Sequence, residues 1–168
     1  MLASNLALAM VAMPGSLIIP QSQLDSAFKV PTTAQNEAKI QVPIEFTYMS
    51  QSFSVFHPGI DLATEFGTKI LPIESGIVIE ASFSPFGYGN EVLIDNGNGI
   101  ESLYAHLSKI EVKKGDEVNI KTEIGLVGST GHSTGPHLHL EIHKNGAPIN
   151  PLTILPPLTN HLITSIQQ

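Results

Sequence analysis

The most regular pattern of polar and apolar positions in this chain begins at residue 137. From there to residue 143 the sequence reads HLHLEIH, so polar and apolar residues alternate at every position. This period of two predicts a half-buried β-strand in which Leu138, Leu140 and Ile142 face a hydrophobic core. The opposite face of the predicted strand then carries four polar side chains, which belong to His137, His139, Glu141 and His143.

Short β-like stretches separated by turns are found upstream of this strand. Alternating or β-branched residues predict strands over 44–48, 76–81, 91–95, 101–107 and 123–127. An Asn-Gly-Asn-Gly run predicts a hairpin turn between the third and fourth of these strands. Because no long helical period is present, the sequence favours an all-β fold, either an antiparallel two-sheet sandwich or a partly open barrel.

Three parts of the chain differ in composition. Residues 1–41 are an apolar segment followed by a polar linker or pro-segment, residues 42–155 are the predicted folded domain, and residues 156–168 are a C-terminal extension. No lysine precedes the apolar run, and Pro14 and Gly15 interrupt it short of the roughly 20 residues of a membrane-spanning helix. No transmembrane span is therefore predicted. An export signal, a truncated start and a buried apolar segment are the alternatives.

Charge and composition narrow the range of functions. The 168-residue chain has a formal net charge of -7, and its 8 basic residues are all lysine. Without arginine or a run of lysines, a nucleic-acid partner is not expected. The chain has no cysteine, which excludes disulfides and cysteine-based zinc sites. A zinc site here must therefore use histidine and carboxylate ligands.

Two groups of potential metal ligands are present. His137 and His139 point to the same side of the predicted strand, and the Gly- and Pro-containing loop before them lets a ligand approach closely. His57 and Asp61 flank a Pro-Gly bend that is expected to direct both side chains into one pocket, the alternative being two polar loop residues without a role. A zinc site with three such ligands leaves a fourth position for water, as catalytic zinc sites do. The residues alone leave both His137 and His139 as candidate ligands.

A further histidine lies on another predicted strand. Alternation over 102–107 places Ser102, Tyr104 and His106 on one face, so His106 is expected to project out of the core. The alternative is a surface or half-buried histidine without a role in a site. Tyr104 is expected either to line the site or only to pack beside it.

Several other residues are candidates for the surroundings of the site. A loop expected to wall a groove contains Phe83, Phe86, Gly87, Tyr88 and Gly89. For its phenylalanines, packing in the core is the alternative. Glu141 is expected either to orient a ligand histidine or to remain a solvated charge at the strand edge. His132 and His143 are expected at the surface.

Taken together, these fragments carry a specific resemblance. They are His57-x-x-x-Asp61, the Tyr-Ala-His-Leu-Ser stretch at 104–108, Gly-Ser-Thr-Gly at 128–131 and Gly-Pro-His-Leu-His at 135–139. In this order, from about residue 43 to residue 151, the chain resembles the M23 family of zinc metallopeptidases, the lysostaphin-like or LytM-type peptidoglycan endopeptidases. The resemblance implies an antiparallel β fold with a groove across one sheet and zinc on the floor of that groove.

The resemblance also implies a role for each polar residue of the site. By motif position, His57, Asp61 and His139 match the metal ligands of the family. His106 and His137 match its catalytic histidines. One Zn²⁺ per chain is therefore expected. Some relatives have lost their ligands and only activate other wall enzymes. Because all five positions are filled here, this role is not expected for the chain.

The activity implied is the hydrolysis of peptide bonds in peptidoglycan stem or cross-bridge peptides by a zinc-activated water. The chain has no His-Glu-x-x-His motif, so a histidine is expected to act as the base. Peptidoglycan peptides would be the partner, and the cell envelope, periplasmic or secreted, the location. The alternatives are a non-hydrolytic peptidoglycan-binding or hydrolase-regulating module, and a structural zinc domain with His106 or His137 as a fourth ligand. The bond cut and the oligomeric state are left open.

Overall fold

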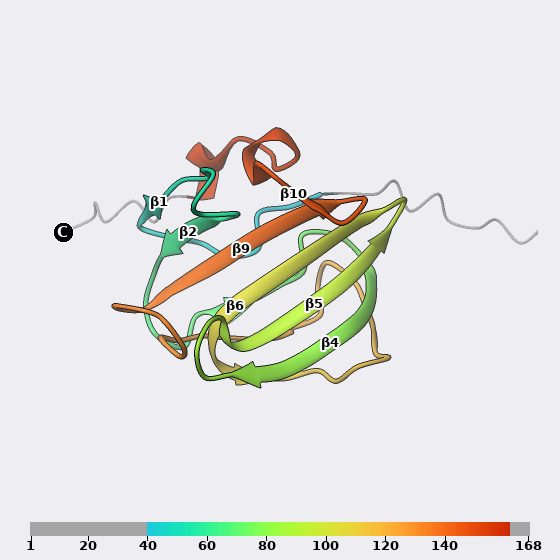
Figure 1. The fold of residues 1–168 in the computed structure, drawn as a ribbon, viewed down its shortest axis with the longest axis horizontal. Helices are drawn as coiled ribbons and strands as arrows, with labels where there is room; N and C mark the ends of the chain where they lie inside the picture. The colour runs from blue at the N-terminus through green and yellow to red at the C-terminus, as the bar shows by residue number, and fades with distance from the viewer. Residues whose placement is uncertain (1–39, 162–168) are drawn as a thin grey trace, which may run out of the picture. The chain divides into compact units, whose positions relative to one another are not determined.

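Residues 40–161 are described by the computed structural model shown in Figure 1. The predicted N-terminal segment, 1–41, lies outside these residues except at its last two positions, and the C-terminal extension is described only to residue 161. The three-part division of the chain therefore stays a prediction. Among the described residues, no helix combines the length and the apolar character needed to cross a membrane.

Ten strands and two short 3₁₀ helices make up the described part of the chain. The strands are β1 (Tyr48–Gln51), β2 (Ile60–Ala63), β3 (Lys69–Ile70), β4 (Gly76–Ser84), β5 (Gly89–Gly97), β6 (Ile100–Ile110), β7 (Glu117–Val118), β8 (Gly125–Val127), β9 (His137–Lys144) and β10 (Ala147–Ile149). The helices are η1 (Pro151–Thr153) and η2 (Leu158–His161).

The strands form one antiparallel hydrogen-bonded network. Its main path runs β1-β2-β9-β6-β5-β4-β7, while β10 pairs with β9, and β8 pairs with both β6 and β3. The path does not return to its first strand, so the sheet stays open. The expected all-β antiparallel class is confirmed. Strand β9 lies between β2 and β6, as Figure 1 shows, and this position determines which residues meet at the site.

The β5–β6 hairpin forms at the predicted turn. Gly97 pairs with Ile100, and the two residues between them, Asn98 and Gly99, have φ angles of 53° and 73°. Positive φ at both central positions is the property of the type I′ turn, whose twist matches that of the two strands. The predicted hairpin turn is therefore confirmed, and its type is the one that Asn-Gly favours.

The predicted strands from residue 76 onward correspond to β4, β5, β6 and β8, but the first predicted strand differs. Over 44–48, alternation does place Ile44 and Phe46 in the core. However, β1 begins only at the last residue of this stretch. The Thr47 N–H donates to the carbonyl of Ala63, the last residue of β2, at 2.8 Å, and the Leu71 N–H donates to the Pro43 carbonyl at 3.0 Å. The segment thus makes separate bonds to two parts of the chain and no continuous strand ladder.

The apolar face predicted for β9 is buried. Leu138, Leu140 and Ile142 have no exposed surface, and Ile60 and Leu62 of β2 contact the same core. Burial of each such side chain contributes about 1.5–3 kcal/mol. Because a shift of one residue would turn these side chains to the other face, their burial fixes the register of β2 against β9. The polar residues of β9 consequently lie on the opposite face.

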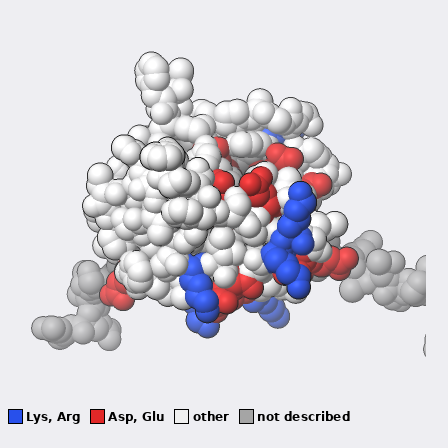
Figure 2. Space-filling view, turned by 60° about the horizontal axis from the view of Figure 1, so that its bottom comes forward, with Lys and Arg blue, Asp and Glu red and all other residues white. Residues whose placement is uncertain are grey.

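Charged side chains are interspersed on the face of the molecule seen in Figure 2. Lysines lie beside acidic residues in this view, and a large part of the surface is uncharged. Two lysines form close ion pairs, Lys69 with Glu123 and Lys109 with Glu111, each at 2.7 Å. Both lysine side chains are largely exposed, so these pairs contribute little to stability.

Candidate metal centre and active site

Three strands meet at His139. In the β2–β9 pairing Asp61 lies opposite His139, and in the β6–β9 pairing Ala105 lies opposite it on the other side. Directly opposed residues of antiparallel strands have Cβ atoms about 4.5–5.5 Å apart. The register that buries the leucines of β9 therefore also places the Asp61 carboxylate next to the His139 imidazole.

His57 reaches the same place because the chain before β2 packs closely on β9. A Cβ atom at Gly59 would lie 2.5 Å from the carbonyl oxygen of Leu140 and 2.9 Å from Cε1 of His139. Only glycine permits this approach. The predicted Pro-Gly bend thus brings His57 and Asp61 into one pocket.

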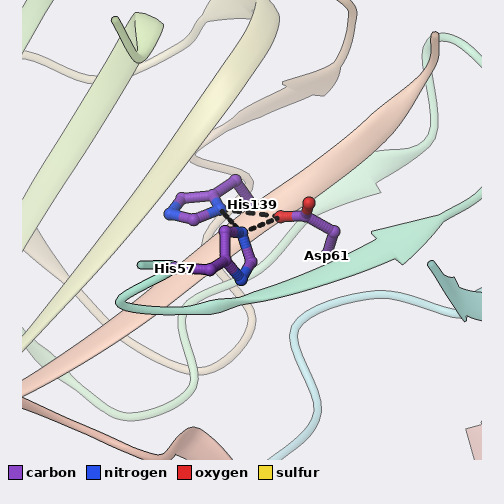
Figure 3. Close-up of side chains that lie close together, drawn as sticks. All are labelled: His57, Asp61 and His139. Carbon is purple, nitrogen blue, oxygen red and sulfur yellow. Dashed lines mark hydrogen bonds and ion pairs between the residues drawn. The ribbon is translucent and has the colours of Figure 1, made fainter. Parts of the chain in front are cut away.

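The three predicted metal ligands converge, as Figure 3 shows. Nε2 of His57 lies 3.1 Å from Oδ1 of Asp61 and 3.1 Å from Nδ1 of His139. Nδ1 of His139 lies 2.7 Å from the same Asp61 oxygen. Nitrogen and oxygen ligands of a tetrahedral zinc ion lie roughly 3.3 Å from one another. A small outward movement of the three side chains would therefore accommodate the ion.

Hydrogen bonds on the far side of each imidazole determine which nitrogen faces the centre. Nδ1 of His57 donates to the Ser52 carbonyl at 3.1 Å, and Nε2 of His139 donates to the Glu141 carboxylate at 3.0 Å. Since these oxygens only accept, the other nitrogen of each neutral ring carries a lone pair. Two imidazole lone pairs and the Asp61 oxygen therefore face one another. A cation relieves their repulsion, and this donor set suits zinc.

The same contacts control the charges of the cluster. Burial lowers the pKa of His139, but its hydrogen bonds with Asp61 and Glu141 outweigh burial and raise the pKa to about 9. Burial raises the pKa of Asp61, yet the hydrogen bond with His139 and the charges of the nearby histidines hold it below its usual value. Without a metal, His139 thus keeps a second proton, on Nδ1, at neutral pH, and a metal ion bound to this nitrogen would take the place of that proton beside the ionised Asp61.

His106 lies beside this cluster, but not by the predicted alternation. Ser102 and Tyr104, expected on its face of the strand, are fully buried in the core. Between Tyr104 and Leu107, β6 has one residue more than the β5 segment that it pairs with, and His106 has a φ of 65°. Such a β-bulge turns the strand and re-aims a side chain. The prediction that Tyr104 shares the His106 face is therefore wrong, whereas His106 does line the groove.

Hydrogen bonds hold both the backbone and the ring of His106. Its N–H donates to the Tyr88 carbonyl at 2.8 Å, and its Nδ1 donates to the Thr130 carbonyl at 2.8 Å. Thr130 is fixed in turn, because its hydroxyl donates to the Leu107 carbonyl and accepts from the Asn90 N–H. Burial lowers the pKa of His106 despite the Thr130 bond, so the ring is neutral at neutral pH with a lone pair on Nε2.

His137 lies next to His106 at the start of β9. Its Nδ1 donates to the Gly135 carbonyl at 2.8 Å, and its Nε2 lies 3.8 Å from Oδ2 of Asp61. The ring centroids of His106 and His137 are 4.7 Å apart, and those of His106 and His139 are 5.7 Å apart. All five residues predicted for the site therefore line one groove.

The remaining polar residues of β9 are also ordered. Glu141 is only 1% exposed and bonds to His139, so the alternative of a solvated strand-edge charge is wrong. His143, expected at the surface, is half-buried and donates from Nε2 to Glu141 at 2.6 Å. His132 is an exposed loop residue, as expected, and lines the groove.

The cluster lies in a groove with a volume of about 480 Å³. Tyr88 forms part of its wall, as predicted for its loop. Phe83 and Phe86 are 60% and 97% exposed, so the alternative that they pack in the core is wrong. Sequence reasoning missed Gln51 and Phe56, which also line the groove. No periodicity marks these two residues, although Phe56 directly precedes His57.

Comparison with known proteins defines the family. The sequence profile described as Peptidase family M23 matches residues 55–151, which include all five predicted site residues. The chain belongs to this family. Membership in a family of metalloproteases implies a metal ion, for which His57, Asp61 and His139 are the candidate ligands.

Individual relatives agree with this assignment. DD-carboxypeptidase/endopeptidase Mpg of Neisseria meningitidis is 42% identical over 125 residues, which cover 68% of this chain and 29% of that protein. Peptidoglycan DD-endopeptidase ShyA of Vibrio cholerae is 41% identical over 104 residues, which cover 62% of this chain and 24% of that protein. The crystal structure of a zinc containing peptidase from Vibrio cholerae matches with a TM-score of 0.63 and 31% identity, covering 67% of this chain and 39% of that one. The chain thus spans about a quarter of the length of these curated relatives.

Proposed function

We propose that this chain is a zinc-dependent endopeptidase that hydrolyses peptide bonds in the stem or cross-bridge peptides of peptidoglycan. The observation that carries the proposal is the convergence of two imidazole lone pairs and one carboxylate oxygen, from His57, His139 and Asp61, beside two further histidines in a groove. The name of ShyA, a peptidoglycan DD-endopeptidase, supports the substrate class and, with it, a location in the cell envelope, and the name of Mpg supports endopeptidase activity.

The metal would be held by His57, Asp61 and His139, one ion per chain. When bound, zinc supplies a Lewis acid that polarises a carbonyl and lowers the pKa of water to about 7. A site with three protein ligands keeps a position open for water or substrate, as catalytic rather than structural zinc sites do.

His106 and His137 would move the protons. Each ring bonds through Nδ1 to a backbone carbonyl, which fixes its orientation and leaves Nε2 for the reaction. A neutral imidazole at this place accepts a proton from the attacking water. A protonated one donates a hydrogen bond to the tetrahedral oxyanion or a proton to the leaving amine. The two histidines together thus provide one base and one acid for amide hydrolysis.

The test uses the purified full chain and peptidoglycans of defined cross-link type, with release of new amino groups as the readout. The proposal predicts release from at least one wall type, its loss on chelation and its return when zinc is added. Release that persists after complete removal of the metal would contradict the metal-dependent mechanism. No release from any wall by a zinc-loaded chain would indicate a binding or regulatory module instead.

A further inference from the structure

We propose that Glu141 and Tyr88 are positioning residues, which hold the imidazole of His139 with Nδ1 turned toward the metal. The inference rests on the zinc binding of the proposed function and extends it to two residues outside the ligand set. Neither residue is among the three side chains that face the centre.

Glu141 is a buried carboxylate that accepts hydrogen bonds from three side chains. One oxygen, Oε1, accepts from the Tyr88 hydroxyl at 2.5 Å and from Nε2 of His139 at 3.0 Å. The other, Oε2, accepts from Nε2 of His143 at 2.6 Å. A carboxylate only 1% exposed persists as an anion because these donors replace the water that it has lost.

The hydrogen bond to Glu141 determines the tautomer of His139. With the proton held on Nε2, the lone pair is on Nδ1, which points at His57 and Asp61. Carboxylates that bond to metal-binding histidines in this way fix the ring and increase its basicity as a ligand. Without Glu141 the buried Nε2–H would lack an acceptor, and the ring would be free to reorient.

Tyr88 connects this carboxylate to the other half of the site. Its hydroxyl donates to Glu141, and its backbone carbonyl accepts from the N–H of His106. The ring of Tyr88 also lies beside that of His139, with centroids 5.7 Å apart. One residue of the β4–β5 connection therefore contacts both the support of a metal ligand and the backbone of a histidine proposed for catalysis.

The experiment compares the zinc dissociation constants of the full chain and its variants, by competition with a chromophoric chelator. Glu141→Leu should weaken zinc binding by roughly 10- to 100-fold. Glu141→Gln should lose less affinity, because its amide oxygen can still accept from His139. Tyr88→Phe should weaken zinc binding because it removes one hydrogen-bond donor to Glu141. The loss of affinity should be smaller than in Glu141→Leu, because the carboxylate itself stays in place.

Tyr104→Phe is the matched control. Tyr104 is also buried, and its hydroxyl accepts from the Ile73 N–H and donates to Ser102, neither of which is a ligand or a groove residue. This variant should lower the unfolding temperature of the chelated protein but keep the wild-type zinc affinity. A purely structural role of Glu141 and Tyr88 predicts the same behaviour for their variants.

A second readout follows the ring itself, through the nitrogen chemical shifts of His139 in the zinc-loaded protein. The inference predicts a metal-bound Nδ1 and a protonated Nε2 in the wild type, and exchange broadening of these signals in Glu141→Gln. Wild-type zinc affinity in Glu141→Gln and Tyr88→Phe, with unchanged His139 signals, would overturn the inference, even where Glu141→Leu fails to fold. Failure of the wild-type chain to bind zinc would instead overturn the proposed function on which the inference rests.

Discussion

His106 has an unusual backbone conformation at the centre of the site. Among the described residues, the other non-glycine residues with positive φ are Asn98 and Asn145, both in turns. Any residue other than glycine adopts this conformation at a cost of order 1–3 kcal/mol, although asparagine and histidine do so more often than most. The bonds of His106 to Tyr88 and Thr130 hold it there. Strain of this kind is typical of functional residues.

This conformation leads to a prediction about two substitutions at the same position. Both His106→Ala and His106→Gly should lower turnover by about 10²- to 10⁴-fold, because a proton-transfer group is lost. His106→Gly should be more stable than His106→Ala by about 1 kcal/mol, because glycine adopts positive φ without strain. Urea unfolding of the two chelated variants measures the difference. Greater stability of the alanine variant would show that the backbone at this position is not strained.

The two histidines of the His-x-His motif should differ in their effect on metal content. His139→Ala removes a ligand and should lose most of the bound zinc. His137→Ala should retain about one zinc per chain. In the wild type, Nε2 of His137 lies 3.8 Å from Oδ2 of Asp61, and His137 is not among the three residues whose ligand atoms converge. Metal analysis after gel filtration distinguishes the two variants. Equal loss of zinc from both would make His137 a ligand.

For single residues, the sequence predicted which side chains line the groove better than it predicted their geometry. The strict alternation around His139 indicated its outward face correctly. His106 was also a correct candidate for the groove, but alternation would have brought Tyr104 with it. A bulge depends on the pairing with a distant strand, so no local pattern at 102–107 reveals it. Tyr88 was predicted only as part of a wall, since its bond to Glu141 joins residues 53 positions apart.

Among the elements, β9 and the bend before β2 together build the metal centre. Gly59→Ala should therefore damage both stability and zinc binding, because its Cβ would lie 2.5 Å from the Leu140 carbonyl oxygen. The bend must move away from β9, and overpacking of this kind costs about 1–3 kcal/mol. Thermal unfolding and zinc affinity are the two measurements.

Gly135→Ala is the control for that prediction. Gly135 lies in the loop before β9, and a Cβ there would meet no atom within 4 Å. Its φ is not in the positive range, so alanine introduces no strain. This variant should unfold at nearly the wild-type temperature and bind zinc normally. If Gly59→Ala were equally harmless, the close packing of the bend on β9 would not be what brings His57 to its place.

The elements were predictable where their signals were local. The β5–β6 turn needed positive φ at two adjacent positions, and Asn98 and Gly99 supply it. The segment at 44–48 was not predictable in the same way. Its alternation does bury Ile44 and Phe46, but whether a strand forms depends on a continuous partner strand, and here the backbone makes separate bonds to the end of β2 and to Leu71.

For the whole molecule, zinc should act as a link between distant parts of the chain. His57 and His139 are 82 residues apart in sequence, so the unfolded chain lacks a preformed site. A ligand that binds only the folded state adds about 2.7 kcal/mol to the free energy of unfolding at 100 times its dissociation constant. Urea unfolding with buffered zinc and with chelator measures this difference. Equal stability under both conditions would contradict a site built from the folded chain.

The fold class was predictable from the frequent turns and short strands, but the order of the strands was not. That β9 lies between β2 and β6 follows from long-range packing of their apolar faces, which no single stretch encodes. The residues alone suggested a zinc site that combines residues 57 and 61 with the His-x-His strand, and the resemblance to a known family selected residue 139 from its two histidines. The boundaries at 41 and 155 stay predictions, because the match to the family covers residues 55–151 alone.

Zinc content and peptidoglycan hydrolysis should be measured together in the wild type, His106→Ala and His139→Ala. The wild type should bind zinc and cleave peptidoglycan, His106→Ala should bind zinc without turnover, and His139→Ala should do neither. Undiminished turnover in His139→Ala, or a zinc-loaded wild type that cleaves no peptidoglycan of any cross-link type, would contradict the assignment of this groove as a zinc peptidase site.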